Sequence, residues 1–173
     1  GAELLGPAGF RKQVAVKVIK SKVLAKADSR YVEFFIREAR LGGLLKHPNI
    51  VDIYEFGDTD GQLYIVMEHV EGQSLSQLIA LGNRLPPSVV LEIGSGIAAG
   101  LASAHGLRSE GLPAGLVHRD IKPSNVLISQ NGAVKVADFG IAITRHGELA
   151  DPQRERREVA GSVSYMSPEQ MQG

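Results

Sequence analysis

The sequence, 173 residues long, contains no cysteine. Disulfide bridges, thiolate metal sites and catalytic thiols all require that residue, so these three kinds of chemistry are excluded. The sequence also lacks an excess of charge of either sign, because 19 basic side chains balance 19 acidic ones. It therefore shows no electrostatic sign of a nucleic acid partner, and we expect none.

Long apolar runs are missing too, since no stretch of about 18 uncharged apolar residues occurs. The longest weakly polar run, residues 89–104, contains Glu92, three glycines and two serines. We therefore expect no membrane contact within this segment and a cytoplasmic location, which also suits the cytoplasmic domain of a longer, membrane-anchored protein. The apolar share of 43% is ordinary for a globular domain, so a disordered chain is not expected.

Two charged residues stand out because each occupies an apolar setting. The alternation of residues 13–19 predicts a strand, in which Lys17 shares a face with Ala15. The apolar spacing of residues 29–46 predicts a helix, and Glu38 falls at the centre of its apolar stripe. A lone charge that faces a core is costly unless it is paired, so both side chains are expected to need a partner.

The other predicted elements follow in an order that separates strands from helices. The first helix should end at residues 47–49, because Pro48 disfavours helical geometry in the residue before it. After it we expect strands at 50–56 and 62–68 joined by a hairpin loop, helices at 75–81 and 88–104, and strands at 126–129 and 133–137. Strands with one helix, followed mainly by helices, predict an α+β fold of two lobes joined near residues 68–73.

The most specific motif is His-Arg-Asp-Ile-Lys-Pro-Ser-Asn at residues 118–125. Val-Ala-Val-Lys at 14–17 and Glu38 precede it, and Asp-Phe-Gly follows at 138–140. In this order and spacing the motifs resemble the signature set of protein kinases. The chain is similar to the eukaryotic-like serine/threonine protein kinases of bacteria over essentially its whole length. The resemblance implies transfer of the γ-phosphate of ATP to Ser or Thr hydroxyls of protein substrates.

The resemblance implies a role for each residue of the catalytic motifs. Asp120 corresponds to the aspartate that orients and deprotonates the substrate hydroxyl. Lys122 corresponds to the lysine that stabilises the γ-phosphate. Asn125 and Asp138 correspond to the ligands of Mg²⁺, for which Mn²⁺ can substitute, and oxygen ligands are what such a hard cation prefers.

The resemblance also implies how the chain would hold ATP. Lys17 should bind the α- and β-phosphates while Glu38 holds Lys17, which would pair the two misplaced charges. Five residues are implied as adenine contacts: Met67 as the gatekeeper, Glu68 and Val70 through backbone hydrogen bonds, and Ala15 and Leu127 as the two sides of a sandwich around the ring. His118 is expected to be structural and packed behind Phe139, rather than to act as a base.

A last motif resembles the end of the kinase activation segment, where a peptide substrate docks. Its residues are Ser162, Ser167, Pro168 and Glu169. In the family, the glutamate pairs with an arginine of a later helix that this chain does not contain. No Ser, Thr or Tyr occurs at residues 146–160, so no phosphorylation site is expected in the middle of that loop.

The fold implied by the resemblance is a two-lobe protein kinase fold truncated at both ends. Residues 1–67 would form the N-terminal lobe without its glycine-rich loop, 68–73 the hinge, and 74–173 part of the C-terminal lobe. Such an excerpt is expected to be inactive by itself. Without the glycine-rich loop it would hold ATP weakly, and without the later helices its core would be incomplete.

Other interpretations stay open at this point. The motif residues could have ordinary structural roles: an edge-strand charge for Lys17, a solvated carboxylate for Glu38, and turn residues for Asp120, Asn125 and Asp138. The whole chain could be a non-catalytic kinase-like binding or scaffold fragment, or a small-molecule phosphotransferase of similar fold such as an aminoglycoside kinase. The intact catalytic residues argue against the scaffold, and Lys122 with residues 167–169 favours a protein substrate.

Overall fold

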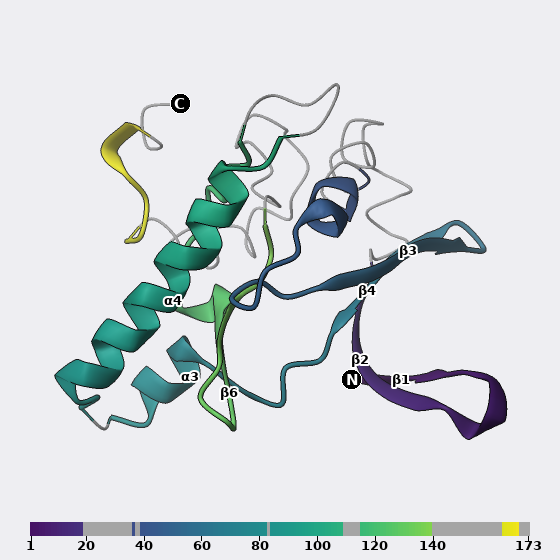
Figure 1. Cartoon of the computed structure of the whole chain (residues 1–173), viewed down its shortest axis with the longest axis horizontal. Coiled ribbons are helices and arrows are strands. Elements are labelled where there is room, and N and C mark those ends of the chain that lie inside the picture. Colours follow the sequence, from purple (N-terminus) through teal and green to yellow (C-terminus); the bar gives the residue numbers. More distant parts are fainter. Residues whose placement is uncertain (19–35, 37–38, 83, 109–114, 140–163, 170–173) are drawn as a thin grey trace, which may run out of the picture.

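The structure is a computed structural model that describes residues 1–18, 36, 39–82, 84–108, 115–139 and 164–169. It has a four-stranded sheet in the order β1-β2-β4-β3 and a three-stranded sheet in the order β5-β6-β7. The strands are β1 (Ala2–Leu5), β2 (Arg11–Val18), β3 (Ile53–Thr59), β4 (Gln62–Glu68), β5 (Gly72–Ser74), β6 (Val126–Ser129) and β7 (Val134–Val136). The helices include α3 (Leu75–Ala80) and α4 (Pro87–His105), and short 3-10 turns lie at η1 (Pro7–Gly9) and η2 (Pro123–Asn125). Figure 1 shows the larger sheet at one side of the molecule and the smaller sheet, covered by α4, at the other.

One face of the larger sheet carries the first apolar core. Ala15 pairs with Met67 and Lys17 with Ile65 across β2 and β4, so these four side chains share that face. Ala39 packs onto it, in a cluster with Leu63, Ile65, Ile53, Phe56 and Met67. Residues 36 and 39–44 are helical, which agrees with the expected helix, and its other residues up to position 38 lie outside the described ranges.

The β3–β4 hairpin closes through Asp60 and Gly61, whose φ angles are 53° and 74°. Two successive residues at positive φ match the twist of the flanking strands, and Asp-Gly is a pair that favours this turn. Asp58 supports the turn by accepting a hydrogen bond from the Gly61 N–H at 2.8 Å. The two expected strands are thus confirmed, although the first lies at 53–59 and not at 50–56.

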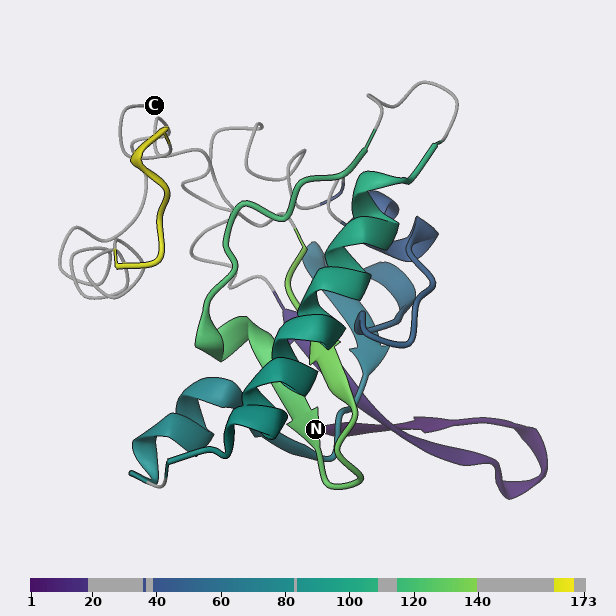
Figure 2. The ribbon, with the colours of Figure 1, turned by 60° about the vertical axis from the view of Figure 1, so that its left-hand side comes forward.

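The sequence did not predict β1 or β5. All four residues of β1 are exposed, so the strand lacks the apolar–polar alternation by which a strand is recognised. β5 has only three residues, which is too short for a strand pattern to be recognised. Figure 2 shows the β1–β2 hairpin projecting away from the rest of the molecule, which explains the exposure of β1.

The smaller sheet is covered by α4, which was expected at 88–104 and spans Pro87–His105. Gly96 and Gly100 bring the helix very close to its neighbours. A Cβ atom at Gly100 would lie 2.9 Å from the Asn49 carbonyl oxygen, and one at Gly96 would lie 2.9 Å from Val134 Cβ. Two clusters fill the space around the helix, and their buried members are Leu45, Ile50, Ala104, Val136, Phe139, Ile93, Val126 and Val134.

Among the described residues, α4 is the one helix whose length and composition alone would allow it to cross a membrane. Core helices of soluble proteins pass the same test, so the observation is weak evidence of a membrane span. Three of its residues, Ile93, Gly100 and Ala104, are buried within the protein.

A short extended segment joins the two halves of the structure. The Val51 N–H donates to the Val136 carbonyl and the Val136 N–H donates to the Asn49 carbonyl, each at 2.9 Å. On its other side, the Asp52 carbonyl accepts a hydrogen bond from the Glu68 N–H at 2.8 Å. Residues 49–52 therefore connect the end of β4 to β7, and β7 runs directly toward Asp138.

Candidate active site

The three expected catalytic residues contact one another, because Lys122 and Asn125 both reach Asp120. The Lys122 Nζ lies 2.7 Å from Asp120 Oδ2. The Asn125 Nδ2 donates to the same oxygen at 3.0 Å and to the Asp120 carbonyl at 2.8 Å. The chain returns on itself here because Pro123 starts η2, in which the Asn125 N–H donates to the Lys122 carbonyl at 2.9 Å. The Asp120 carboxylate is thus ionically paired and fixed in orientation.

His118 connects this loop to the segment that leads to Asp138. The ring is buried, with 1% of its surface exposed. Its Nδ1 accepts a hydrogen bond from the Asp120 N–H at 3.2 Å, so its Nε2 carries the proton and donates to the Ala137 carbonyl at 2.9 Å. Burial lowers the pKa of His118, so the neutral ring is favoured. The ring centroid lies 4.6 Å from that of Phe139, which confirms the expected structural role.

Asp138 faces a lysine from the opposite half of the structure. The Lys17 Nζ on β2 lies 2.8 Å from Asp138 Oδ1. The Lys17 side chain is 34% exposed and the Asp138 side chain is 41% exposed. The Ala137 N–H donates to the Asn125 carbonyl at 2.9 Å, which ties the Asp138 segment to the loop at residues 118–125. Arg119 and Asp138 have φ angles of 65° and 58°. Such left-handed conformations cost about 1–3 kcal/mol in a non-glycine residue and cluster at functional sites.

A pocket opens between these groups. Lys17 and Asp138 are the charged residues of its lining, and the remaining lining is apolar: Gly42, Leu45, Ile50, Val51, Ile53, Ile65, Met67, Val136 and Phe139. The Lys17–Asp138 pair therefore stands at the edge of an apolar recess, where an ion pair is less screened than on an open surface. An arrangement of fixed charges beside a recess suits the binding of a charged small molecule.

Comparison with known proteins is decisive at this point, because residues 8–173 match the family model described as "Protein kinase domain". The chain belongs to the protein kinase family. It is 40% identical over 162 residues to "Serine/threonine-protein kinase PrkC" of Bacillus subtilis (strain 168), which covers 94% of this chain and 23% of that protein. It is 41% identical over 177 residues to "Tyrosine-protein kinase MasK" of Myxococcus xanthus (strain DK1622), which covers 99% of this chain and 27% of that protein.

Solved structures support the same family. The crystal structure of the Mycobacterium tuberculosis PknI kinase domain matches with a TM-score of 0.62 and 34% sequence identity. The match covers 76% of this chain and 50% of that one. The predicted protein kinase fold is therefore confirmed. The chain spans between 23% and 27% of the length of the two kinases named above.

The five residues expected to contact adenine come from both halves of this kinase domain. Ala15 and Met67 are cross-strand partners, and Met67 lines the pocket beside Lys17. Leu127 lies on β6, in register with Lys135 of β7. The Glu68 N–H already donates to the Asp52 carbonyl, so a backbone contact from Glu68 to adenine would have to use its own carbonyl. Val70 follows β4 and is half-buried.

Two of the predicted site residues fall outside the described ranges. Glu38, the expected partner of Lys17, and Ser162 both belong to segments of which nothing is described. Ser167, Pro168 and Glu169 are described and exposed. Hydrogen bonds from its own backbone N–H and from the Ser167 hydroxyl lower the pKa of Glu169, so its carboxylate is ionised.

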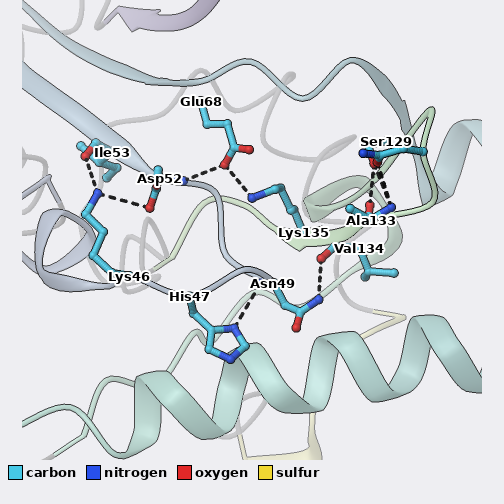
Figure 3. Close-up of polar contacts among 11 residues, drawn as sticks. Lys46, His47, Asn49, Asp52, Ile53, Glu68, Ser129, Ala133, Val134 and Lys135 are labelled. Carbon is cyan, nitrogen blue, oxygen red and sulfur yellow. Dashed lines mark hydrogen bonds and ion pairs between the residues drawn. The ribbon is translucent and has the colours of Figure 1, made fainter.

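Sequence reasoning missed the ion pair between Glu68 and Lys135. The Lys135 Nζ lies 2.8 Å from Glu68 Oε2, and the two side chains are 17% and 22% exposed. Figure 3 shows Lys135 and the Asp52 backbone meeting at the Glu68 carboxylate. The signal was present, because Lys135 is a lone charge between two apolar residues of a strand, as Lys17 is.

Proposed function

We propose that the protein carrying this chain is an ATP-dependent serine/threonine protein kinase. The observation that supports this most directly is the fixed Asp120 carboxylate, with Lys122 Nζ at 2.7 Å and Asn125 Nδ2 at 3.0 Å from one of its oxygens. A carboxylate held in one orientation can align a substrate hydroxyl and accept its proton. The Lys122 ammonium lies beside it, where it can stabilise the charge of a γ-phosphate in transfer.

The donor atoms of Asn125 and Asp138 fit a hard divalent cation. Because the Asn125 Nδ2 donates to Asp120, its amide oxygen, which accepts a long hydrogen bond of 3.5 Å from the Ser124 hydroxyl, is the atom that can bind a metal. Among the described residues no three His, Cys, Asp or Glu side chains gather, which fits a cation that completes its shell with phosphate and water oxygens. We assign Mg²⁺, or Mn²⁺, to Asn125 and Asp138. When bound, the cation would neutralise phosphate charge during transfer.

The remaining ATP contacts follow from the placement of the two halves. We propose that Lys17, which contacts Asp138 across the site, binds the α- and β-phosphates of ATP. We propose that Glu38 holds Lys17 in place. We assign adenine to the space between residues of β2, the end of β4 and β6, namely Ala15, Met67, Glu68, Val70 and Leu127. The lobes would then be residues 1–67 and 74–173, joined by a hinge at 68–73 that overlaps the start of β5.

Proteins with Ser or Thr hydroxyls are the proposed substrates. We assign peptide docking to residues Ser162, Ser167, Pro168 and Glu169, of which the last three are exposed. No contact with nucleic acid or membrane is proposed within this segment, and the proposed location is cytoplasmic. Tyrosine phosphorylation is the second candidate, because one relative of 41% identity is named a tyrosine-protein kinase.

Transfer of labelled phosphate from ATP to a generic protein substrate tests the proposal in the full-length protein. The expected products are phosphoserine and phosphothreonine, identified by phosphoamino-acid analysis. Asp120→Asn should reduce turnover by about 10²-fold or more, because it removes the proton acceptor while it preserves the shape of the side chain.

Three results would contradict this proposal. Predominant phosphotyrosine would favour the second candidate, and transfer to small alcohols but not to protein would indicate a small-molecule phosphotransferase. Nucleotide binding without any transfer, in both the unmodified protein and the variant, would indicate a non-catalytic scaffold.

A further inference from the structure

Of the ion pairs that the structure describes, Glu68–Lys135 has the least exposed side chains, at 22% and 17%. The Glu68 Oε2 also accepts a hydrogen bond from the Asp52 N–H at 3.2 Å, and the Glu68 N–H donates back to the Asp52 carbonyl at 2.8 Å. Glu68 is therefore held by its backbone and by its carboxylate. With these two hydrogen bonds to Asp52 in place, the Glu68 carboxylate points toward Lys135 of β7, as Figure 3 shows.

The position of Lys135 in its strand gives the pair its significance. Val134 and Val136 flank Lys135 and are buried in the cores around α4, so strand alternation turns Lys135 to the opposite face of β7. Leu127 is the cross-strand partner of Lys135 and shares that face. We expect Leu127 to contact adenine from the side of the smaller sheet. We expect Glu68, at the end of β4, to contact adenine from the hinge.

We propose that the Glu68–Lys135 ion pair sets the separation between these two walls of the nucleotide site. Lys135 and the Glu68 side chain are then positioning residues for adenine binding, although neither side chain needs to touch the nucleotide. The inference rests on the proposed function, because it requires an adenine nucleotide in that space. A site whose walls are held at the right distance before binding loses less conformational freedom when the ligand enters.

The local contacts distinguish this pair from an ordinary surface pair. Lys46 and Asp52 form a neighbouring ion pair of 3.2 Å, but their side chains are 60% and 37% exposed, so solvent and salt screen them. The Glu68–Lys135 pair is part-buried, and removal of one partner leaves the other charge without its counter-ion. Lys46 is thus a matched control: a lysine in the same network whose loss should matter little for nucleotide affinity.

The test measures the dissociation constant of ADP by calorimetric titration of the full-length protein and of five variants. Glu68→Gln removes the charge but keeps an acceptor for the Asp52 N–H, and Lys135→Met removes the partner charge at similar length. Each should weaken ADP binding by about fivefold or more, and the double variant should bind no more weakly than the weaker single one, since coupled residues are non-additive. Lys135→Arg and the control Lys46→Met should both stay within about twofold of the unmodified protein.

Thermal unfolding of the same variants separates positioning from stability. A merely structural role would lower the melting temperature of Lys135→Met and leave its ADP affinity unchanged well below that temperature, which would overturn the inference. Equal losses of affinity in Lys46→Met and Lys135→Met would overturn it as well. Absence of ADP binding by the unmodified protein would overturn both the proposed function and this inference, whereas normal binding that neither single variant alters would overturn the inference alone.

Discussion

His118 shows at the scale of one residue how burial creates a dependence on pH. The folded protein keeps the ring neutral, because burial lowers its pKa below the ordinary value of about 6.5. Just below that ordinary value the unfolded chain binds a proton at His118 that the folded chain does not. Stability should therefore fall as the pH is lowered from about 7.5 to about 5.5, and urea unfolding at the two pH values measures the loss.

His118→Gln should be less stable at both pH values and should lose less stability between them. Glutamine can still accept and donate a hydrogen bond but does not titrate. An identical loss in the His118 variant and in the unmodified protein would rule out His118 as the titrating group.

Single residues also show what could be predicted of the site. Asp120, Lys122 and Asn125 were recognised by type and spacing, and the structure brings all three together. The left-handed backbone of Arg119 and Asp138 could not be anticipated, because neither is glycine and the conformation is imposed by the surrounding hydrogen bonds. Lys135, a lone charge between two valines, was overlooked because its partner Glu68 lies 67 positions earlier in the chain.

At the scale of one element, α4 depends on glycine for its close packing. Gly100→Ala should destabilise the protein by about 1–3 kcal/mol, because the new Cβ would lie 2.9 Å from the Asn49 carbonyl oxygen, a backbone atom. Gly94→Ala on the same helix has no atom within 4 Å of the new Cβ and should stabilise it by up to about 1 kcal/mol. Urea unfolding compares the two, and equal effects would contradict this account of the packing.

Elements differ in how far the sequence predicts them. The expected ends of α4 and of β4 are within one residue of the observed ones. A long apolar pattern after Pro86 and Pro87 defines α4, and the Asp-Gly turn marks the start of β4. The strands β1 and β5 were not predicted, since one is wholly exposed and the other has only three residues. Both are specified by their partners in the sheet, which local sequence does not reveal.

At the scale of the whole molecule, the site is divided between two halves that meet along residues 49–52. Lys17 belongs to the larger sheet and Asp138 follows the smaller one, yet their charged atoms lie 2.8 Å apart. The separate motifs allowed each residue to be named from the sequence. Their direct contact was not anticipated, because Lys17 was expected to pair with Glu38.

This division predicts that Lys17 and Asp138 act as one unit in phosphoryl transfer. Lys17→Met and Asp138→Asn should each lower kcat/KM for ATP by about 10²-fold or more, because each removes charge from the place where we propose that the phosphates and their cation bind. The double variant should lose less than the product of the two single losses, since residues that serve one step are non-additive. Lys12→Met is the control on the same strand, where Lys12 lies over the Tyr54 ring at 3.8 Å, and its activity should stay within about twofold. Additive losses in the double variant would show that the two residues act independently and that their contact across the site has no part in the reaction.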